Sequence, residues 1–299
     1  MISYNQNFIS SIDAGDKIIH VFTSTENIDK KTVESFGEEW SAFNTFNENE
    51  IYNAGDNYFD LLPVGILNKN TKALDVGCGT GRWSYYLSEK VGAIECIDPS
   101  KAVLAASKLL AAKDNIRISQ ASADNIPFAD NTFDLVFSLG VLHHIPDTAA
   151  AVKKCVEKVK DNGYILLYLY YNLENRGLAF KSLFHLSNSI RWIVSKLPSK
   201  IKTAVCDVLA VLIYMPFVSV SRILIELHVS AKTIEKIPLS WYADKTFNII
   251  RNDSLDRFGT PLEQRFSKSE ITQMLVQAGC SNIVFADNAP YWRVIAQKK

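Results

Sequence analysis

Three glycines at alternate positions, Gly77, Gly79 and Gly81, lie in the segment LDVGCGTG at residues 74–81. Glycine has no Cβ, so such a turn leaves one edge of its main chain open to close approach, and a ligand is the expected neighbour. Asp75 stands two residues before the first glycine. Its carboxylate would repel a pyrophosphate but suits a ligand that carries an ammonium or sulfonium charge. The G-x-G-x-G spacing also differs from the G-x-G-x-x-G of dinucleotide-binding turns.

Two adjacent histidines, His143 and His144, follow a short apolar run in the segment GVLHHIPD. An imidazole near its unperturbed pKa of about 6.5 can remove a proton at neutral pH. We therefore interpret the pair as candidate general bases for a reaction at a hydroxyl group. The alternative, that the pair only positions its loop, stays open.

Apolar runs alternate with helical patterns through the centre of the chain. Because such alternation builds a doubly wound parallel sheet, we expect the glycine turn and the histidines at the carboxyl edge of that sheet, where these folds bind ligands. Strands are predicted at residues 72–76, 93–97, 116–121, 135–139 and 164–170, and helices at 82–90, 100–113 and from an Asp147 cap to a turn at 161–163.

The C-terminal residues complete the predicted sheet. Ser267 and Glu270 form a capping-box pattern ahead of a helix that Gly279 can end. Residues 282–286 and 291–297 are then two further strands, expected to form an antiparallel hairpin at the edge. The sheet would therefore have seven strands.

Composition narrows the class of partner. Lys plus Arg equals Asp plus Glu at 32 each in 299 residues, so no basic surface indicates nucleic acid. The five cysteines are never closer than 18 residues, which excludes a local Cys-x-x-Cys metal site, and they are expected to be reduced core thiols. The first residues show no signal-peptide pattern. We expect a cytoplasmic protein with a small-molecule partner and no metal.

Three segments in order, LDVGCGTG, IDPS and ADNIPFADNTFDLVFSLGVLHHIPD, resemble the motifs of class I S-adenosylmethionine-dependent methyltransferases. The similarity is to the branch of ubiquinone/menaquinone-type and bacterial sugar or natural-product enzymes, and it covers roughly residues 70–172 and the C-terminal strands. It implies an α/β, Rossmann-like seven-stranded sheet with an antiparallel C-terminal edge hairpin. It also implies S-adenosyl-L-methionine as cofactor and methyl transfer as the reaction.

The resemblance assigns roles to individual residues. Asp75 would meet the methionine ammonium, Gly77 and Gly79 would let the main chain approach the aminoacyl part, and Asp98 would accept hydrogen bonds from the ribose hydroxyls. The sequence departs from the family in the adenine loop, where Ser122 replaces the usual acidic residue. The implied cofactor set is Asp75, Gly77, Cys78, Gly79, Asp98, Pro99, Ser122, Ala123, Asp124 and Leu139, with Cys78 interpreted as a small packing residue and the Ala123 main chain and Asp124 sharing the adenine contact.

Four regions are expected along the chain. Residues 1–71 form an N-terminal helical, aromatic-rich cap, which either covers the cofactor or packs on the sheet. Residues 72–171 form the cofactor-binding core, and residues 267–299 complete it. Residues 172–266 are far longer than the connection that the minimal fold needs, so we expect a helical lid that recognises the acceptor.

Acceptor recognition is assigned to aromatic and arginine side chains, because these suit sugar-like and anionic ligands. The alternative for Arg257 and Arg265 is pairing with nearby acids such as Asp256 and Glu263. The uncharged residues 208–221, which Pro216 is expected to interrupt, are judged too short to cross a membrane and could be a homodimer face or a peripheral membrane contact. The acceptor-binding candidates are Trp241, Tyr242, Arg257, Arg265 and Tyr291.

The expected function is methyl transfer to a hydroxyl of a small-molecule, sugar or glycolipid-like acceptor. A nitrogen or carbon acceptor remains open, because a neutral amine needs no strong base. A catalytically silent methyltransferase-like binding protein is the remaining alternative, and product formation from labelled cofactor distinguishes it from an enzyme.

Overall fold

A computed structural model describes residues 1–22, 26–42, 47–174, 177–288 and 292–299. The chain divides into two units. The core unit comprises Met1–Asn175 and Leu262–Lys299, and the helical unit comprises Arg176–Pro261. The predicted insertion, residues 172–266, is slightly longer than the helical unit, because residues at both of its ends belong to the core unit.

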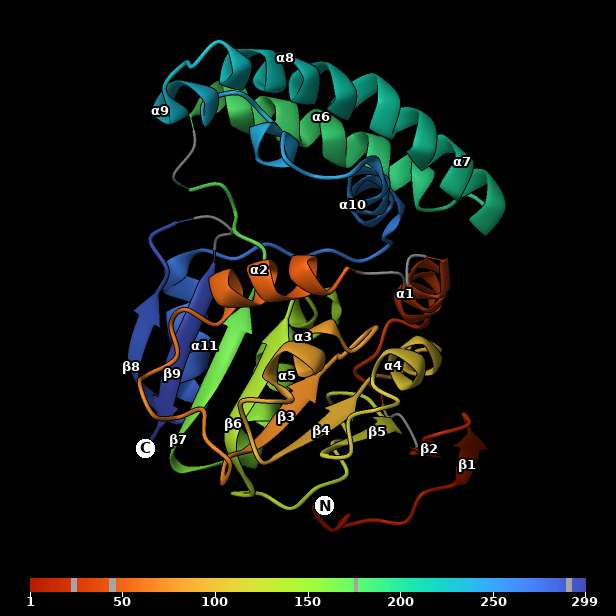
Figure 1. Cartoon of the computed structure of the whole chain (residues 1–299), viewed down its shortest axis with the longest axis vertical. Coiled ribbons are helices and arrows are strands. Elements are labelled where there is room, and N and C mark those ends of the chain that lie inside the picture. Colours follow the sequence, from red (N-terminus) through yellow and green to blue (C-terminus); the bar gives the residue numbers. More distant parts are fainter. Residues whose placement is uncertain (23–25, 43–46, 175–176, 289–291) are drawn as a thin grey trace. The chain divides into compact units, whose positions relative to one another are not determined.

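A sheet of nine strands runs through the described part of the core unit (Figure 1). Its order is β1-β2-β5-β4-β3-β6-β7-β9-β8. The strands from β2 to β7 are parallel, whereas β1, β9 and β8 pair antiparallel with their neighbours. The bounds are β1 Ser10–Asp13, β2 Ile18–Val21, β3 Lys72–Val76, β4 Ala93–Ile97, β5 Ile116–Gln120, β6 Phe133–Leu139, β7 Val159–Tyr168, β8 Cys280–Phe285 and β9 Arg293–Lys298.

Helices cover both faces of this sheet because successive strand residues point to opposite sides. In β3, Leu74 and Val76 join a hydrophobic cluster with α5 and α11, whereas Ala73 joins a second cluster with α2, α3 and α4. The doubly wound α/β class and its antiparallel edge hairpin are confirmed. The helices are α1 Lys30–Ala42, α2 Glu48–Tyr58, α3 Arg82–Leu87, α4 Val103–Leu109, α5 Thr148–Lys158 and α11 Lys268–Gln277.

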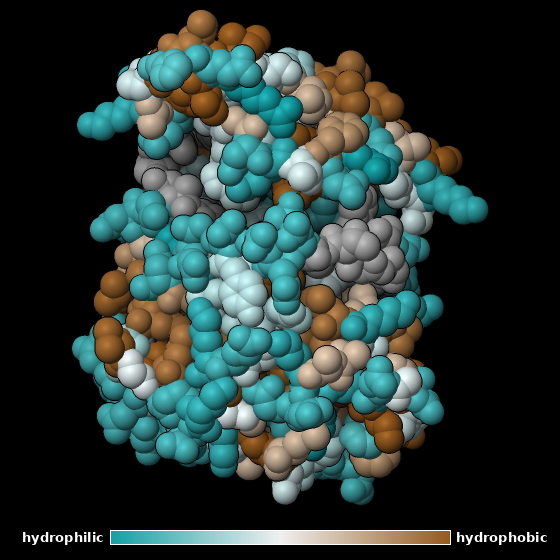
Figure 2. All heavy atoms as spheres, viewed as in Figure 1, coloured by the Kyte–Doolittle hydropathy of each residue, from teal (hydrophilic) through white to brown (hydrophobic). Residues whose placement is uncertain are grey.

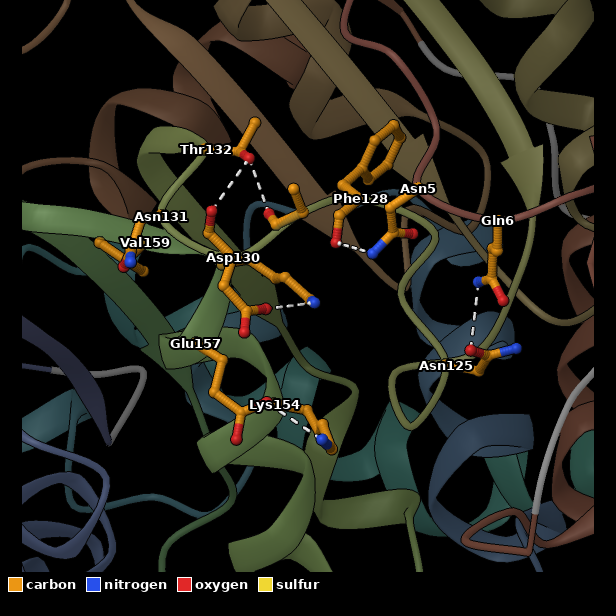
Figure 3. A network of polar contacts seen from close by, with 12 residues as sticks. Asn5, Gln6, Asn125, Phe128, Asp130, Asn131, Thr132, Lys154, Glu157 and Val159 are labelled. Carbon is orange, nitrogen blue, oxygen red and sulfur yellow. Dashed lines mark hydrogen bonds and ion pairs between the residues drawn. The ribbon is translucent and has the colours of Figure 1, made fainter.

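The predicted count of seven strands is too low. All seven predicted strands are present, and β1 and β2 extend the sheet beyond β5, so residues 1–71 are not purely helical. Polar contacts fasten the N-terminal segment to the loop after β5: Asn5 Nδ2 donates to the Phe128 carbonyl at 3.0 Å, and Gln6 Nε2 donates to Asn125 Oδ1 at 3.1 Å (Figure 3). Strand β2 has only four residues, so its alternation of apolar and polar side chains is too short to predict a strand without knowledge of the neighbouring strand.

The turn predicted at residues 161–163 lies inside β7 rather than before it. Asn162 adopts a positive φ of 63°, and the pairing of β6 with β7 shifts register between Phe133 and Leu135. Asparagine tolerates this left-handed conformation. The turn residues therefore make an irregularity within the strand. The caps at Asp147 and Ser267 form as predicted.

Every element described in the helical unit is a helix, as predicted for the insertion. The prediction that Pro216 interrupts residues 208–221 is wrong, because Ser199–Glu226 is continuous over 28 residues. A π-helical turn ends at Tyr214, two residues before Pro216, whose missing N–H would break a regular α-helical hydrogen-bond ladder. The elements are α6 Leu178–Val194, α7 Ser199–Leu209, the π-turn η2 Ala210–Tyr214, α8 Met215–Glu226, α9 Ala231–Ile234, the 3₁₀ turn η3 Ser240–Tyr242 and α10 Phe247–Gly259.

The continuity of this helix also corrects the expected length of the apolar segment. At about 1.5 Å per residue, the 28 residues of Ser199–Glu226 span about 42 Å, more than the roughly 30 Å of a bilayer core. By length and composition the helix could cross a membrane, so the argument that it is too short is wrong. Length and composition are weak evidence for spanning, since core helices of soluble proteins meet the same criterion.

Candidate active site

The glycine turn joins β3 to α3 at the carboxyl edge of the sheet. The amides of Gly77 and Cys78 both donate to the Ile97 carbonyl, at 2.8 and 3.0 Å, which ties the turn to the end of β4. Gly77, Gly79 and Gly81 have φ values of 78°, 53° and 83°, in the left-handed region that favours glycine. The backbone conformation therefore requires glycine at all three positions.

The surroundings of the three glycines differ. A Cβ on Gly77 would lie 2.4 Å from a Val141 methyl group, and one on Gly81 would lie 2.6 Å from Leu110, so packing of the chain on itself excludes both. A Cβ on Gly79 would have the indole nitrogen of Trp40 as its nearest neighbour, at 3.5 Å. Only at Gly79 does the turn leave room for another group against the main chain. A ligand can therefore approach the main chain at Gly79 but not along the whole turn.

Asp98 is held at the end of β4 by donors from two sides. Its Oδ2 accepts from the Gly79 amide at 3.0 Å, and its Oδ1 accepts from the amide and the hydroxyl of Ser100 at 2.8 and 2.6 Å. A carboxylate offers about four acceptor positions, and three of them are used, so capacity remains for one further hydroxyl donor. The carboxylate lies directly beside the open edge at Gly79. This arrangement fits the ribose of S-adenosylmethionine.

Asp75 is a buried carboxylate, and one of its two oxygens lacks a hydrogen-bond donor among the described residues. Its Oδ2 accepts from the Ser84 hydroxyl at 2.7 Å, whereas Oδ1 has no hydrogen-bond partner among the described residues. Burial raises the pKa of Asp75 to about 7, with the nearby Asp98 carboxylate as a smaller cause. Because an unpaired buried acceptor costs about 1–3 kcal/mol, a positively charged donor would both satisfy this oxygen and lower that pKa. The ammonium of the cofactor is such a donor.

The remaining predicted cofactor residues line the neighbouring strand ends. Ser122 donates its hydroxyl to Asp124 in the loop after β5, so the two adenine-loop candidates contact one another. Ala123 and Leu139 are buried, and Pro99 is half-buried and accepts from Gln120 through its carbonyl. A hydrogen bond with the neighbouring Cys96, and then burial, raise the pKa of the Cys78 thiol, which packs as a small apolar group as expected. All five cysteines are free and buried.

The histidines lie in the 3₁₀ turn η1, Leu142–His144, directly after β6. His144 is fixed by its ring, since Nδ1 lies 2.6 Å from the Leu262 carbonyl, and the Gln264 amide donates to the His143 carbonyl at 2.9 Å. Residues 262–266, where the chain returns to the core unit, thus fasten the histidine loop. No local pattern could indicate this contact, because His144 and Leu262 are 118 positions apart in the chain.

His143 differs from its neighbour. It is fully buried, and neither ring nitrogen has a hydrogen-bond partner among the described residues. Its ring stacks on Tyr170 with centroids 3.9 Å apart, and His144 lies on another side at 4.1 Å. Burial, then the nearby His144 and Arg265, hold the pKa of His143 well below its usual range. The imidazole is therefore neutral at pH 7, with its lone pair available. Sequence reasoning missed Tyr170.

The two alternatives for the N-terminal cap, covering the cofactor or packing on the sheet, correspond to two different helices. In α1, Trp40 lies against Gly79, and Phe36 contacts His144 with ring centroids 4.8 Å apart, so this helix lies against the candidate site. In α2, Gly55 packs directly on the Tyr86 ring, and the following Phe59 stacks on the same ring at 5.3 Å. Helix α2 therefore packs on the sheet through α3.

The structure separates the predicted acceptor residues. Trp241 is exposed and Tyr242 is buried in the helical unit. Arg257 donates to the Tyr214 hydroxyl at 2.8 Å and lies 3.5 Å from Asp253, so it does pair with a neighbouring acid.

Arg265 belongs to the core unit and does pair with Glu263, at 2.7 Å. Its guanidinium also lies 5.1 Å from the centre of the Tyr170 ring. This charge is therefore close to His143, which stacks on the same ring. Tyr291 lies outside the described residues.

A hollow of about 380 Å³ lies away from these residues, near the amino ends of β3 and β4. Its lining carries no histidine and none of the predicted site residues. The candidate set lies instead at the carboxyl edge: Asp75, Gly79, Asp98 and His143. The Gly79 amide donates to Asp98, and Asp98 lies within electrostatic range of Asp75, whereas His143 follows β6 at the same edge of the sheet.

Residues 74–167 match the family model described as "Methyltransferase domain". They span β3 to β7 and contain the whole edge set. This central part of the chain is a class I S-adenosylmethionine-dependent methyltransferase domain. The resemblance seen in the motifs is thereby confirmed for the domain, and S-adenosylmethionine is its cofactor.

Similar proteins include demethylmenaquinone methyltransferase of Staphylococcus aureus strain JH9, 36% identical over 110 residues, which are 36% of this chain and 45% of that protein. The chain thus spans less than half the length of the curated relatives it matches. A methyltransferase structure from Methanococcus maripaludis is 17% identical, with 92% of this chain and 97% of that chain covered and a TM-score of 0.49. A phosphoethanolamine N-methyltransferase 2 structure from Haemonchus contortus, in complex with S-adenosylhomocysteine, is 14% identical over 84% of this chain and 42% of that chain, with a TM-score of 0.45.

Proposed function

We propose that this protein transfers the methyl group of S-adenosylmethionine to a hydroxyl of a small-molecule, sugar or glycolipid-like acceptor. The observation that carries the proposal is the buried, unpartnered imidazole of His143 at the edge that holds Gly79 and Asp98. A hydroxyl acceptor must lose a proton as it gains the methyl group, and a neutral imidazole can accept it. The hydroxyl of the acceptor would thus be the hydrogen-bond partner that the His143 ring lacks among the described residues.

The cofactor supplies an electrophilic methyl group on a sulfonium. The chain's own part is to hold and align the reactants. In this proposal Asp98 accepts from the ribose hydroxyls, Asp75 faces the ammonium, and the main chain at Gly79 approaches the aminoacyl part. Alignment of two reactants in a fixed geometry can account for much of the rate enhancement, since the sulfonium is already a good leaving group.

The position of His143 sets the conditions for proton removal. Its lowered pKa keeps the ring in the basic form throughout the neutral range but makes it a weaker base than a solvent-exposed histidine. Helix α1 and the Tyr170 ring pack around the pair, so little water reaches the proton acceptor. A hydroxyl of ordinary acidity would then transfer its proton as the methyl group arrives rather than beforehand.

An amine or carbon acceptor is the alternative, and the relatives named demethylmenaquinone methyltransferase favour testing a quinone-like ring as well. A neutral amine loses its proton only after methylation, so it needs no base as well placed as His143. A silent binding protein is disfavoured by the complete set of Asp75, Gly79 and Asp98. Acceptor recognition by Trp241, Tyr242, Arg257, Arg265 and Tyr291 stays a prediction, as do the lid role of residues 172–266 and a cytoplasmic location.

The decisive experiment supplies methyl-labelled S-adenosylmethionine with panels of glycans, glycolipids, hydroxylated small molecules, amines and quinones. Label transfer to a hydroxylated compound, lost in His143→Ala, supports the proposal. Transfer only to amines or to ring carbons, undiminished in that variant, overturns the hydroxyl assignment. Cofactor binding without transfer to any panel would favour the binding protein.

A further inference from the structure

The outer side of the long helix Ser199–Glu226 is apolar along its length. Exposed side chains recur there at helical spacing, and Leu212 is 66% and Ile223 55% exposed. Figure 2 shows apolar side chains gathered over the segment that Figure 1 labels α7 and α8. We call this surface the apolar stripe; its residues are Ile201, Val208, Val211, Leu212, Val220, Ile223 and Leu227.

Three charged residues within this helix are turned away from the stripe, whereas Lys200 and Glu226 are exposed near its two ends. Lys202 is buried, Asp207 makes two 2.7 Å contacts with Arg251, and Arg222 donates to the carbonyls of Ala243 and Lys245 at 2.8 and 3.0 Å. The opposite side is buried at Cys206, Ala210, Tyr214 and Val218. The helix is therefore amphipathic, with its polar contacts made inside the unit and its apolar side chains outside.

Aromatic and basic residues flank the stripe at the junction of α6 and α7. Trp192 is 65% exposed, and the ammonium of Lys196 lies 3.1 Å from the centroid of its ring. Lys196 and Lys200 are exposed beside the apolar Ile193 and Ile201. Tryptophan and lysine with an apolar body and a polar tip are suited to the boundary between water and lipid.

Net charge distinguishes the helical unit from the rest of the chain. Residues 176–261 contain twelve Lys and Arg but six Asp and Glu, a net charge of +6, although the whole chain has 32 of each. The remainder therefore carries −6. Basic charge and exposed apolar surface occur in the same unit, which is the combination that binds anionic lipid.

We propose that the apolar stripe lies in the headgroup and acyl boundary of an anionic lipid bilayer, with the helix parallel to the membrane plane. A spanning orientation would put Asp207 and Arg222 into hydrocarbon and separate Asp207 from its partner on α10. An isologous dimer through the stripe would bring two units of +6 together, and like charges oppose that. The proposal depends on the helical unit alone and goes beyond methyl transfer.

The test is flotation of the full-length protein with vesicles of phosphatidylcholine and 30% phosphatidylglycerol, compared with pure phosphatidylcholine. We expect at least fivefold stronger binding to the anionic vesicles, weakened by high salt, and release by alkaline carbonate. Leu212→Glu with Ile223→Glu should reduce binding at least tenfold. The matched control Val276→Glu changes an exposed apolar residue on α11, 52% exposed, and should stay within twofold of the parent.

Four results would overturn the proposal. The first is that the parent does not bind anionic vesicles, and the second is that Val276→Glu loses as much vesicle binding as the Leu212→Glu, Ile223→Glu variant. The third is that alkaline carbonate does not release the bound protein, as for a spanning helix. The fourth is that the parent forms a dimer that the double substitution converts to monomers. Circular dichroism and thermal unfolding of each variant show whether it folds, and Lys196→Glu with Lys200→Glu gives a second, purely electrostatic variant. Vesicle binding is scored without cofactor or acceptor, so failure of the methyl-transfer proposal would leave this result unaffected.

Discussion

The core unit and the helical unit differ in where their titratable groups and their exposed apolar side chains lie. In the core, apolar side chains fill both faces of the sheet, and buried carboxylates and histidines gather at one edge, where Asp75 and His143 keep unpartnered atoms among the described residues. In the helical unit, the Tyr214 hydroxyl donates to Asp253 and accepts from Arg257, while the exposed surface carries the apolar stripe.

This difference indicates a different kind of binding for each unit. Unmet hydrogen-bonding capacity in a buried place indicates a group that awaits a small ligand, whereas exposed apolar surface indicates contact with something large. We therefore expect the core edge to carry the chemistry and the helical unit to carry an interaction surface. Changes at the two places should accordingly alter different measurements.

The largest expected effect is at His143. Replacing it by alanine should lower turnover by about 10² to 10⁴, the usual contribution of a general base, while the Kd of S-adenosylhomocysteine changes little. His144→Ala is the comparison, because His144 mainly holds the Leu262 carbonyl. Stopped-time assays with the identified acceptor measure the first quantity and calorimetry the second. Full turnover in both variants would point to an amine acceptor or another base.

Asp98 should govern cofactor affinity rather than turnover chemistry. Asp98→Ala should weaken S-adenosylmethionine and S-adenosylhomocysteine alike by about 1.5–3 kcal/mol, the range for hydrogen bonds to a charged group. Calorimetry with both ligands checks this. Asp114→Ala, which changes an exposed carboxylate outside the predicted cofactor set, is the control. Unchanged affinity of the Asp98 variant would remove that residue from the site.

In the helical unit, the Tyr214 hydroxyl should matter to stability instead of catalysis. Tyr214→Phe removes its contacts with Asp253 and Arg257 and should lower the free energy of unfolding by about 1–2 kcal/mol. Trp241→Phe, at an exposed position, should stay within about 0.5 kcal/mol. Denaturant unfolding measures both. If Tyr214→Phe left stability intact but abolished acceptor use, the polar groups of this unit would have a role in binding.

The smallest effect concerns pH. Asp75 has a pKa raised to about 7 in the free protein, so it is mostly protonated at pH 6 and must lose a proton to face the cofactor ammonium. The Kd of S-adenosylhomocysteine should therefore rise roughly five- to tenfold from pH 7.5 to pH 6. In Asp75→Asn binding should be weaker but nearly independent of pH over this range. A parent profile as flat as that of the variant would contradict the assignment.

Local patterns were sufficient to predict the centre of the fold. The seven predicted strands, the caps at Asp147 and Ser267, and the placement of the glycine turn at the carboxyl edge all depend on residues close in sequence. The class of cofactor followed from the order of three motifs. These features are encoded within windows of about 10 to 30 residues.

Other features depend on contacts between distant segments. Strand β2 is recognisable only through its pairing with β5, and the histidine loop is fastened by residues 262–266. The π-turn before Pro216 reflects a helix that packs along α10, which keeps it continuous despite the proline. The ring nitrogens of His143 likewise lack partners among the described residues because several elements together bury the ring. A local sequence pattern does not indicate such burial.

The junction of the two units has a consequence for folding kinetics. The Asn172 amide donates to the Phe266 carbonyl at 3.0 Å, so the chain leaves and re-enters the core unit at adjacent points. Strands β7 and β9 pair through Tyr168 and Arg293, which are far apart in sequence. If the intervening helical unit, residues 176–261, forms first, the loop that must close becomes roughly three times shorter, which reduces the entropic cost by about 1 kcal/mol at about 0.6 kcal/mol per doubling. Early folding of the helices would then accelerate closure of the sheet edge that completes the methyltransferase domain.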